Sequence, residues 1–361
     1  MKTIRLGFIG AGWVARERHL PGLRNVEAID IARVWSRNTA TAESFAGLCG
    51  ATTAGSWEEV AEARDVDAVV IATPPELHEP ATIRALAAGK HVLCQARMAR
   101  NLRESLSMVQ AAAACDRVTA LYPPKPGLKG DRMMRRLLRD ENFVGAIREV
   151  RVTALAARPD GDAYRWASDP KVVGVNAMVM GMWVEILNRW VGRARRVTAT
   201  AKCHLPTRLA RDGARVAAVV PDTIVVAADL ECGAVGSYHF SVCAASGPGH
   251  QIEIFGSDGA LAYRLFSDEV LGAKNGGEWC PLEIPADEVR TQTTDAEFVG
   301  AIRGGPRVEP GFLDGIAYME FCEAVAYSAL RGTAVNLPLD GPLMEAWQQP
   351  VALKNSEASL A

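Results

Sequence analysis

The fold of this chain is decided near its N-terminus, in the run Ile4-Arg5-Leu6-Gly7-Phe8-Ile9-Gly10-Ala11-Gly12-Trp13-Val14-Ala15. A largely apolar strand leads directly into two glycines, and a helix begins at once. Gly10 permits a tight turn, Gly12 lets the backbone approach a pyrophosphate, and Ala15 is small where the helix must lie near the strand. The first turn of that helix offers unpaired N–H groups to phosphates. The run therefore predicts a dinucleotide-binding loop contacted by Gly10, Gly12, Trp13 and Val14.

Short apolar runs alternate with amphipathic stretches through the first 120 or so residues. This alternation is typical of a parallel sheet with crossover helices, and it predicts a doubly wound α/β domain over residues 1–123. The expected strands are Ile4–Ile9, Ala28–Trp35, Ala68–Ala72, His91–Cys94 and Val118–Tyr122. The expected helical segments are Gly12–Leu23, Thr41–Gly50, Trp57–Ala63, Glu79–Ala88 and Leu102–Cys115.

The pattern changes after Pro123, Pro124 and Pro126, which break any regular element. Closely spaced strand-like runs then predict an α+β domain over residues 124–340, with an open, mainly antiparallel sheet and helices on one face. Its expected strands are Ile147–Leu155, Arg196–Cys203, Thr223–Leu230, Ala234–Val242, Gln251–Phe255 and Ala260–Arg264. Its expected helices are Arg132–Arg139, Met178–Trp190, Ala296–Arg303 and Phe312–Leu330. Residues 341–361 are expected to form a tail or arm.

Composition limits the classes of partner. The chain is 49% hydrophobic and 23% charged with a formal net charge of −2, which gives no pull toward nucleic acid or anionic membranes. Its eight cysteines form neither a CxxC pair nor a Cys/His cluster at zinc spacing, so we expect free thiols and no metal site. The sequence shows no signal-peptide pattern and no long apolar run, so a cytoplasmic protein is expected.

Cofactor specificity is read at the end of the second strand, where an acidic residue would bind the ribose 2′-OH of NAD. The chain has Trp35, Ser36 and Arg37 there, and none is acidic. Arg37 can pair with a 2′-phosphate and Ser36 can donate to it, so NADP is favoured over NAD.

Four segments resemble the Gfo/Idh/MocA family of glucose-fructose oxidoreductase and inositol dehydrogenase relatives. They are Gly7–Gly12, Ala72–His78, Gly89–Cys94 and Ile252–Gly259. The resemblance implies a Rossmann domain, hydride transfer to or from a sugar, cyclitol or related carbonyl, and a C-terminal sheet that often forms homodimers or homotetramers. It further implies cofactor contacts by Thr73, Pro74, His78 and Gln95.

The family's catalytic pattern does not carry over. Where members have Glu-Lys-Pro, this chain has Gln95-Ala96-Arg97, so the lysine that relays a proton is an alanine. Members also have an Asp-x-Gly-x-His-x-x-Asp stretch. Alignment on Gly181 places Val179, Trp183 and Ile186 at its three polar positions. An aligned acid/base contributes on the order of a hundredfold to ten-thousandfold to such a reaction, so this site needs a replacement.

Several residues are candidates for that site, each with a structural alternative. Lys125, Tyr164 and Glu185 are the candidate acid/base groups, although Lys125 can equally be a surface lysine and Glu185 a buried ion-pair partner of Arg189. The candidate substrate contacts are Arg97, Tyr122, Arg165, Asn176 and Trp183. Trp183, with methionines around it, would make the cleft more apolar and suit an aromatic or flat substrate.

Three functions remain open on the sequence alone. The first is an NADP(H)-dependent oxidoreductase with a displaced acid/base. The second is a lyase, isomerase or hydrolase on the same scaffold. The third is a redox-silent protein that senses the dinucleotide.

Overall fold

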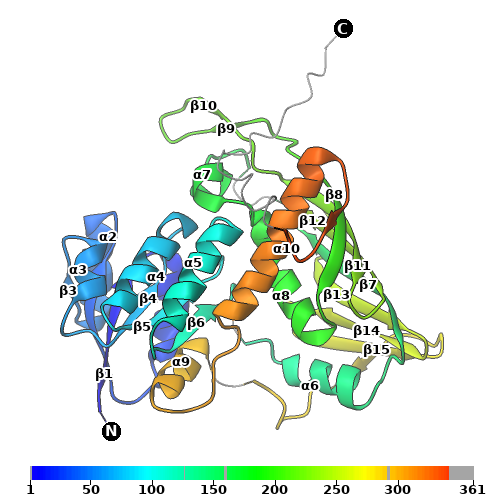
Figure 1. Cartoon of the computed structure of the whole chain (residues 1–361), viewed down its shortest axis with the longest axis horizontal. Helices are drawn as coiled ribbons and strands as arrows, with labels where there is room; N and C mark the ends of the chain where they lie inside the picture. Colours follow the sequence, from blue (N-terminus) through cyan, green and yellow to red (C-terminus); the bar gives the residue numbers. More distant parts are fainter. Residues whose placement is uncertain (1, 126, 158–160, 291–292, 341–361) are drawn as a thin grey trace. The chain divides into compact units, whose positions relative to one another are not determined.

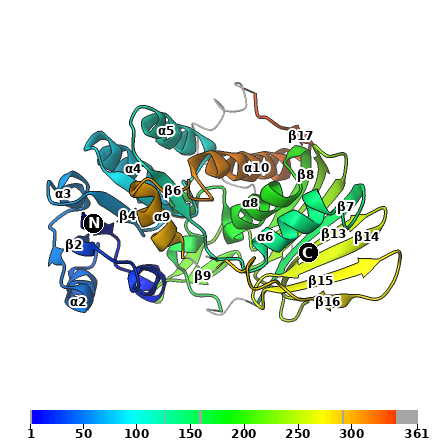
Figure 2. The ribbon, with the colours of Figure 1, turned by 90° about the horizontal axis from the view of Figure 1, so that it is seen from below.

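The computed structural model describes residues 2–125, 127–157, 161–290 and 293–340. These form two compact units, drawn in Figures 1 and 2. Among the described residues, the first unit contains the chain up to Leu128 together with Arg290–Met319, and the second contains Lys129–Val289 and residues 320–340. Residues 290–319, which the predicted division assigns to the second domain, thus group with the first unit. The predicted tail, 341–361, lies outside the described residues.

The first unit is built on a six-stranded parallel sheet with strand order β3-β2-β1-β4-β5-β6. Its strands are β1 (Ile4–Ile9), β2 (Ile29–Trp35), β3 (Thr52–Thr53), β4 (Ala68–Ile71), β5 (His91–Gln95) and β6 (Thr119–Tyr122). All four residues of β4 are buried, as expected for a strand covered on both faces by crossover helices. The predicted doubly wound sheet is confirmed. The short β3 was not predicted, because two exposed threonines carry no strand pattern.

The helices of this unit begin at side-chain caps. Asn38, Ser56, Asn101 and Thr293 each accept a backbone N–H in the first turn of the helix that follows. The helices are α1 (Leu20–Leu23), α2 (Thr39–Cys49), α3 (Trp57–Glu62), α4 (His78–Ala87), α5 (Leu102–Ala113) and α9 (Thr294–Ile302), with a short 3₁₀ turn at Pro75–Leu77. A π-helical turn, Ala15–His19, precedes α1.

The second unit contains a nine-stranded sheet with strand order β16-β15-β14-β13-β7-β12-β11-β8-β17. Only the β12–β7 pair is parallel among these described strands, so the predicted, mainly antiparallel sheet is confirmed. The strands are β7 (Ile147–Leu155), β8 (Ala194–Lys202), β11 (Thr223–Leu230), β12 (Val235–Ser241), β13 (His250–Gly256), β14 (Gly259–Arg264), β15 (Glu269–Lys274), β16 (Cys280–Leu282) and β17 (Val335–Asn336). A separate hairpin pairs β9 (Thr207–Leu209) with β10 (Arg215–Ala217).

Helices cover one face of this sheet, as Figure 2 shows for α6 and α8. Burial alternates along β11 and β12, so one side of each strand faces the core and the other is exposed. From α10, Phe321 packs on Tyr238 of β12 and the Ser328 hydroxyl accepts from the backbone N–H of Ala199. The helical elements are α6 (Asp131–Arg135), continued by a π-helical turn (Arg136–Asp140), α7 (Pro170–Val173), α8 (Met180–Trp190) and the part of α10 (Phe312–Arg331) that follows Met319, with 3₁₀ turns at Trp166–Ser168 and Ala177–Val179.

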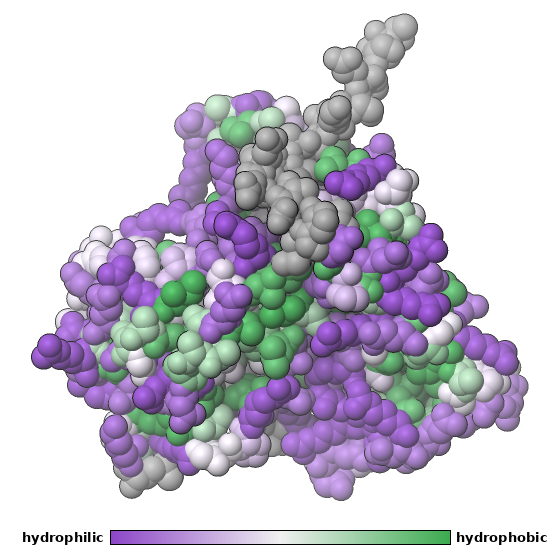
Figure 3. Space-filling model, viewed as in Figure 1, coloured by the Kyte–Doolittle hydropathy of each residue, from purple (hydrophilic) through white to green (hydrophobic). Residues whose placement is uncertain are grey.

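The face of the molecule shown in Figure 3 is mostly hydrophilic, with smaller hydrophobic patches between hydrophilic residues. In the part of the chain that the structure describes, no helix is both long enough and apolar enough to span a membrane.

A buried polar pair ties α9 into the first unit. His19 Nδ1 lies 2.6 Å from Asp295 Oδ1, and the two side chains are 0% and 1% exposed. The Tyr122 ring packs 4.0 Å from the His19 ring. Gly22 is small where it must be, because a Cβ there would lie 2.4 Å from Asp295 Oδ2. The helix that follows the glycine loop is therefore fixed by a residue far along the chain.

We expect Asp295→Ala to lower the free energy of unfolding by about 1–3 kcal/mol, because it leaves His19 Nδ1 buried without its hydrogen-bond partner. Asp30→Ala is the matched control. It removes an exposed carboxylate paired with Arg5 and should cost less than about 1 kcal/mol. Urea unfolding followed by circular dichroism measures both, and equal shifts in the two midpoints would contradict a structural role for the buried pair.

Candidate functional site

The predicted dinucleotide loop lies at the carboxyl edge of the parallel sheet. The N–H of Gly10 donates to Trp35 O (2.8 Å), and the N–H of Ala72 donates to Ile9 O (2.8 Å). Gly10 has φ +103°, and a Cβ on it would lie 2.5 Å from the carbonyl oxygen of Ala72. Gly12 is exposed, and a Cβ there would meet nothing within 4 Å. The loop thus leaves open backbone where a pyrophosphate would bind, and its residues fit that group.

Side chains around the loop stabilise it and leave its outer surface exposed to solvent. Arg16 donates to the carbonyl oxygens of Ala11 (3.4 Å) and Thr41 (3.3 Å). Trp13 is 63% exposed, with the Arg18 guanidinium 5.4 Å from its ring centroid. The π-helical turn that follows widens the helix beside the loop, a feature often found at functional sites.

A cavity of about 290 Å³ lies at the carboxyl ends of β2 and β3. Its lining includes the hydroxyls of Ser36, Thr39 and Thr53 and the guanidinium of Arg37, which is the only charged residue among the described lining residues. Arg37 is exposed and also forms an ion pair with Glu76, from the loop after β4. The cation and hydroxyls that line this cavity are suited to a phosphate group, and the carboxylate beside them, Glu76, is paired with Arg37.

His78 joins the loops that follow β4 and β5. Its Nε2 lies 2.8 Å from Thr73 O, and its Nδ1 lies 2.7 Å from Arg97 O and 3.2 Å from Met98 O. Burial lowers the pKa of His78, although the three carbonyls favour its charged form. A neutral imidazole donates from only one nitrogen, so one of these contacts is left weak. Pro74 continues this loop, and Thr73 Oγ1 is buried with no partner among the described residues, as a group awaiting a ligand would be.

The ends of β5 and β6 bring further predicted residues to the same edge. Gln95 is in register with Tyr122, and the N–H of Ala96 donates to Tyr122 O (2.9 Å). The Arg97 and Tyr122 side chains are 7% and 3% exposed, and burial raises the pKa of Tyr122. Lys125 is half-buried in the turn that follows.

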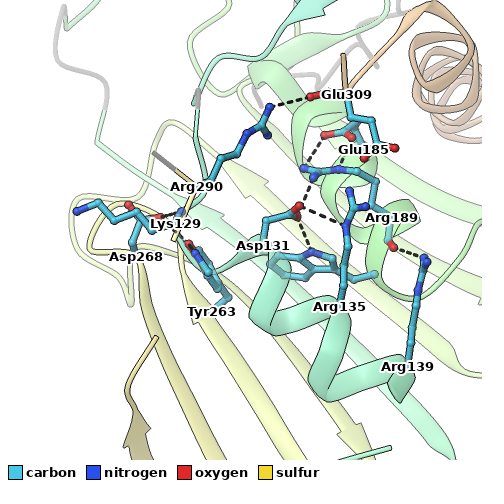
Figure 4. A network of polar contacts seen from close by, with 12 residues as sticks. Lys129, Asp131, Arg135, Arg139, Glu185, Arg189, Tyr263, Asp268, Arg290 and Glu309 are labelled. Carbon is cyan, nitrogen blue, oxygen red and sulfur yellow. Dashed lines mark hydrogen bonds and ion pairs between the residues drawn. The ribbon is translucent and has the colours of Figure 1, made fainter. Parts of the chain in front are cut away.

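The remaining candidates lie in the second unit. Glu185 is 4% exposed and its Oε1 lies 2.5 Å from Arg189 Nε, so the ion-pair alternative for Glu185 is what the structure shows. Arg189 also donates to Asp131 Oδ1 (2.7 Å), which accepts from Trp190 Nε1 as well (2.9 Å). Figure 4 shows this network between α6 and α8. Asp131 and Trp190 are partners that the sequence analysis did not identify.

The entry into α8 is conformationally strained. Met178 (φ 51°) and Val179 (φ 58°) are both left-handed, which is a costly conformation for a β-branched residue. The Asn176 side chain is buried, and its Oδ1 accepts from the N–H of Gly181 at 2.9 Å. Asn176, expected as a substrate contact, thus fixes the start of the helix.

Trp183 stands inside an aromatic stack. It is 1% exposed, and its ring lies 5.3 Å from the His250 ring, which in turn lies 4.7 Å from Phe266. The Nδ1 of His250 is buried and has no hydrogen-bond partner within the described chain, and burial lowers the pKa of this imidazole. Tyr164 is half-buried and Arg165 is exposed.

Sequence reasoning missed a neighbour of a predicted site residue in each unit, Glu76 beside Arg37 in the first and His250 beside Trp183 in the second. Glu76 was visible only as part of a family-like segment, and its pairing with Arg37 depends on the sheet that brings the loops after β2 and β4 together. His250 falls one residue before the predicted strand Gln251–Phe255. Its contact with Trp183 joins elements far apart in the chain, for which no local pattern exists.

Two family models match this chain, one in its N-terminal part and one in its C-terminal part. Residues 4–122 match the model of the oxidoreductase family with an NAD-binding Rossmann fold, and residues 132–262 match the GFO/IDH/MocA C-terminal domain. Glucose-fructose oxidoreductase domain-containing protein 2 of Xenopus tropicalis is 26% identical over 331 residues, covering 88% of this chain and 81% of that protein. The scyllo-inositol 2-dehydrogenase (NADP+) IolU of Bacillus subtilis (strain 168) is 36% identical over 112 residues, 31% of this chain and 34% of that protein.

Solved structures share the fold over nearly the whole chain. Levoglucosan dehydrogenase in complex with NADH has a TM-score of 0.81 at 20% identity, covering 94% of this chain and all of that one. An oxidoreductase domain protein from Kribbella flavida has a TM-score of 0.82 at 22% identity, with 94% and 100% coverage. Because the two parts of the chain match the two domains of one family, this protein belongs to the Gfo/Idh/MocA oxidoreductases, whose N-terminal domain has an NAD(P)-binding Rossmann fold.

Proposed function

We propose that this protein is an NADP(H)-dependent oxidoreductase that acts on a small hydroxyl or carbonyl compound, sugar-like or aromatic. The observation that carries the cofactor choice is the cavity at the ends of β2 and β3, where Arg37 is the charged lining residue. Its guanidinium can exchange Glu76 for a 2′-phosphate, which makes a stronger, bidentate partner. One relative of the chain, the inositol dehydrogenase IolU, is named for NADP+.

The bound dinucleotide would supply or accept the hydride. Gly10 and Gly12 would hold its pyrophosphate, and Ser36 and Arg37 its 2′-phosphate. Thr73 and Pro74 would border it from the loop after β4, which His78 fastens to the next loop.

The proton that accompanies hydride transfer needs a donor, since the family's lysine and histidine positions hold Ala96 and Trp183. Of the three candidates, Tyr164 is the one we test first, because a phenol is protonated at neutral pH and can donate its proton. Burial, and then the charge of Asp169, raise the pKa of Tyr164, which makes it a weaker acid than a free phenol. Glu185 is committed to Arg189, and Lys125 stays a second candidate.

A redox-silent dinucleotide-binding protein is the alternative. Trp183 supports this alternative, because its buried indole ring, stacked on His250, cannot act as the acid/base that hydride transfer needs. Turnover of NADPH distinguishes the two functions.

Self-association through the open sheet face, where Val225 and Val235 are exposed, stays a prediction. Residence in the cytoplasm stays a prediction as well.

Arg37→Ala should weaken NADPH binding about tenfold to a hundredfold and leave NADH binding nearly unchanged, because only NADPH carries the 2′-phosphate. Glu76→Gln should strengthen NADPH binding, since it removes the competing carboxylate. Quenching of tryptophan fluorescence during titration measures both affinities. Arg84→Ala is the control, because Arg84 makes a similar exposed pair with Glu62 on the same unit. Parallel losses for NADPH and NADH in Arg37→Ala would refute the proposed specificity.

His78→Leu should lower the free energy of unfolding by about 1–3 kcal/mol at pH 8 and weaken NADPH binding, because it leaves backbone carbonyls without their partner. Its pKa is lowered by burial, so the unfolded chain takes up this proton at a higher pH than the folded chain. The stability that it contributes is complete above about pH 6.5 and is lost as the pH falls through the folded pKa.

Denaturation midpoints between pH 8 and pH 5 test this pH dependence. His78→Leu should lose stability less steeply than the parent as the pH falls, whereas the exposed control His204→Leu should follow the parent. An identical pH slope in all three proteins would contradict the assigned cause.

Tyr164→Phe should lower kcat by on the order of a hundredfold or more while NADPH binding is unchanged, because it removes only a proton donor. The measurement is NADPH oxidation with a panel of ketoses and aromatic aldehydes. Lys125→Met is compared in parallel, and a selective loss in that variant would transfer the role to Lys125. No turnover by the parent, despite tight NADPH binding, would favour the redox-silent alternative.

A further inference from the structure

The first unit has a second concave site, on the edge of its sheet opposite the glycine loop. A cavity of about 650 Å³ lies there. Ile4 begins β1 and His91 begins β5, while Asp67 directly precedes β4. Because these strands are parallel, their starts share one edge, and the dinucleotide loop follows their ends. The cavity thus belongs to no part of the candidate site described above.

The lining of this cavity is strongly basic. Asp67 is the one carboxylate among its described lining residues, and the chain as a whole has a net charge of −2. The basic residues are Lys2, Arg64, Lys90, His91, Arg117 and Arg303. Five permanent cations against one carboxylate concentrate positive potential in a concave surface, and low-dielectric walls focus that potential.

Two of these cations are held in place by backbone carbonyl groups, which do not neutralise them. Lys90 Nζ donates to the carbonyl oxygens of Ala63 and Val66, both at 2.7 Å. Arg303 donates likewise to the carbonyls of Glu27 (2.6 Å) and Ala28 (3.0 Å). Carbonyl groups satisfy hydrogen bonds and leave the full charge, so both cations remain available to an anion.

Two of the acidic groups nearby, Asp67 and Asp65, are already engaged. Asp67 accepts the backbone N–H of Arg5 (2.9 Å) and lies 3.5 Å from Lys2 Nζ. Asp65, which also acts on Lys90, is paired with Arg33 at 2.7 Å. Within the described ranges, neither of the two remaining arginines that line the cavity, Arg64 and Arg117, makes an ion pair.

Burial is the main cause of the shifted titration of two lining residues, and repulsion by Arg117 adds to it. Burial, followed by the charge of Arg117, lowers the pKa of His91, while Asp67 and the exposed Asp116 oppose the shift. Burial also lowers the pKa of Lys90, where Asp67 and Asp65 oppose the shift more strongly than Arg117 adds to it. His91 Nδ1 accepts the N–H of Val118 (2.9 Å), so the neutral ring carries its proton on Nε2. A bound anion would relieve this repulsion.

We propose that this cavity is a binding site for a small, multiply charged phosphate compound of the pyrophosphate or polyphosphate class. Guanidinium groups form bidentate contacts with phosphate oxygens, and two of the cations are positioned by the backbone in advance. The volume lies in the range of small-molecule sites. A nucleic acid would require an extended basic stripe, and the acidic chain as a whole does not favour one.

The direct test is titration of the full chain with inorganic pyrophosphate, followed by isothermal calorimetry, with and without saturating NADPH. The key variant carries Arg64→Glu and Arg117→Glu, both exposed positions at which folding should be unaffected. The matched control carries Arg84→Glu and Arg103→Glu, which change the net charge equally on α4 and α5 of the same unit. We expect the key variant to lose at least tenfold in pyrophosphate affinity, and the parent and control to bind alike.

Three further results decide the proposal. In the parent, pyrophosphate should shift the imidazole NMR signals of His91 and raise its pKa, because the bound anion stabilises the charged ring. Pyrophosphate binding that NADPH abolishes would belong to the glycine loop and would overturn the second site. Tighter binding of a 20-nucleotide oligonucleotide through the same two arginines would overturn the small-anion assignment. NADPH affinity should be the same in the parent and in the key variant. A failure of the proposed pyrophosphate site can therefore be distinguished from a failure of the proposed NADPH binding.

Discussion

The backbone of Gly10 lies so close to Ala72 that any side chain would collide with the Ala72 carbonyl. This contact can exist only where β1 and β4 are neighbours, which is the point at which the strand order turns from β3-β2-β1 to β4-β5-β6. Crossover helices leave the sheet in opposite directions there, so the strand ends open into a crevice. The loop after β2 with Arg37, the loop after β4 with Glu76 and the His78 contacts all depend on it.

The sequence predicted the first unit well because its signals are local. A strand followed by Gly10 and Gly12 permits few alternatives, and caps such as Asn38 and Asn101 stand just before the helices that they begin. The alternation in β11 and β12 likewise predicted a sheet with one covered face. Most of the elements that were missed, such as β3 and β9, are two or three residues long and mostly exposed, so they carry no periodic pattern. The strand β15 was missed as well, although it is six residues long and its burial alternates.

Only part of the candidate site could be predicted, again because the sequence carries local signals. Residues that follow strands, such as Ser36 and Thr73, lie at one edge of the sheet because the strands are parallel, and the sequence pattern predicted parallel strands. The contacts that a side chain makes with other helices and strands could not be predicted from that pattern. Glu185 pairs with Arg189 one helical turn away, which the sequence could suggest, whereas the stacking of Trp183 on His250 joins a helix to a distant strand. The sequence showed that the family's lysine and histidine are absent. It could not show which residues replace them, because that depends on where side chains lie in three dimensions.

Residues 290–319 complete the core of the first unit from the far end of the chain. Phe298, Val299 and Val308 are buried in the same cluster as Phe8 and Val70, and α9 holds His19 through Asp295. Proteins are synthesised from the N-terminus, and domains generally fold as units while the chain emerges. Here the first unit lacks part of its interior until residues 290–319 have left the ribosome. The nascent sheet therefore keeps an apolar surface uncovered while the second unit is being synthesised.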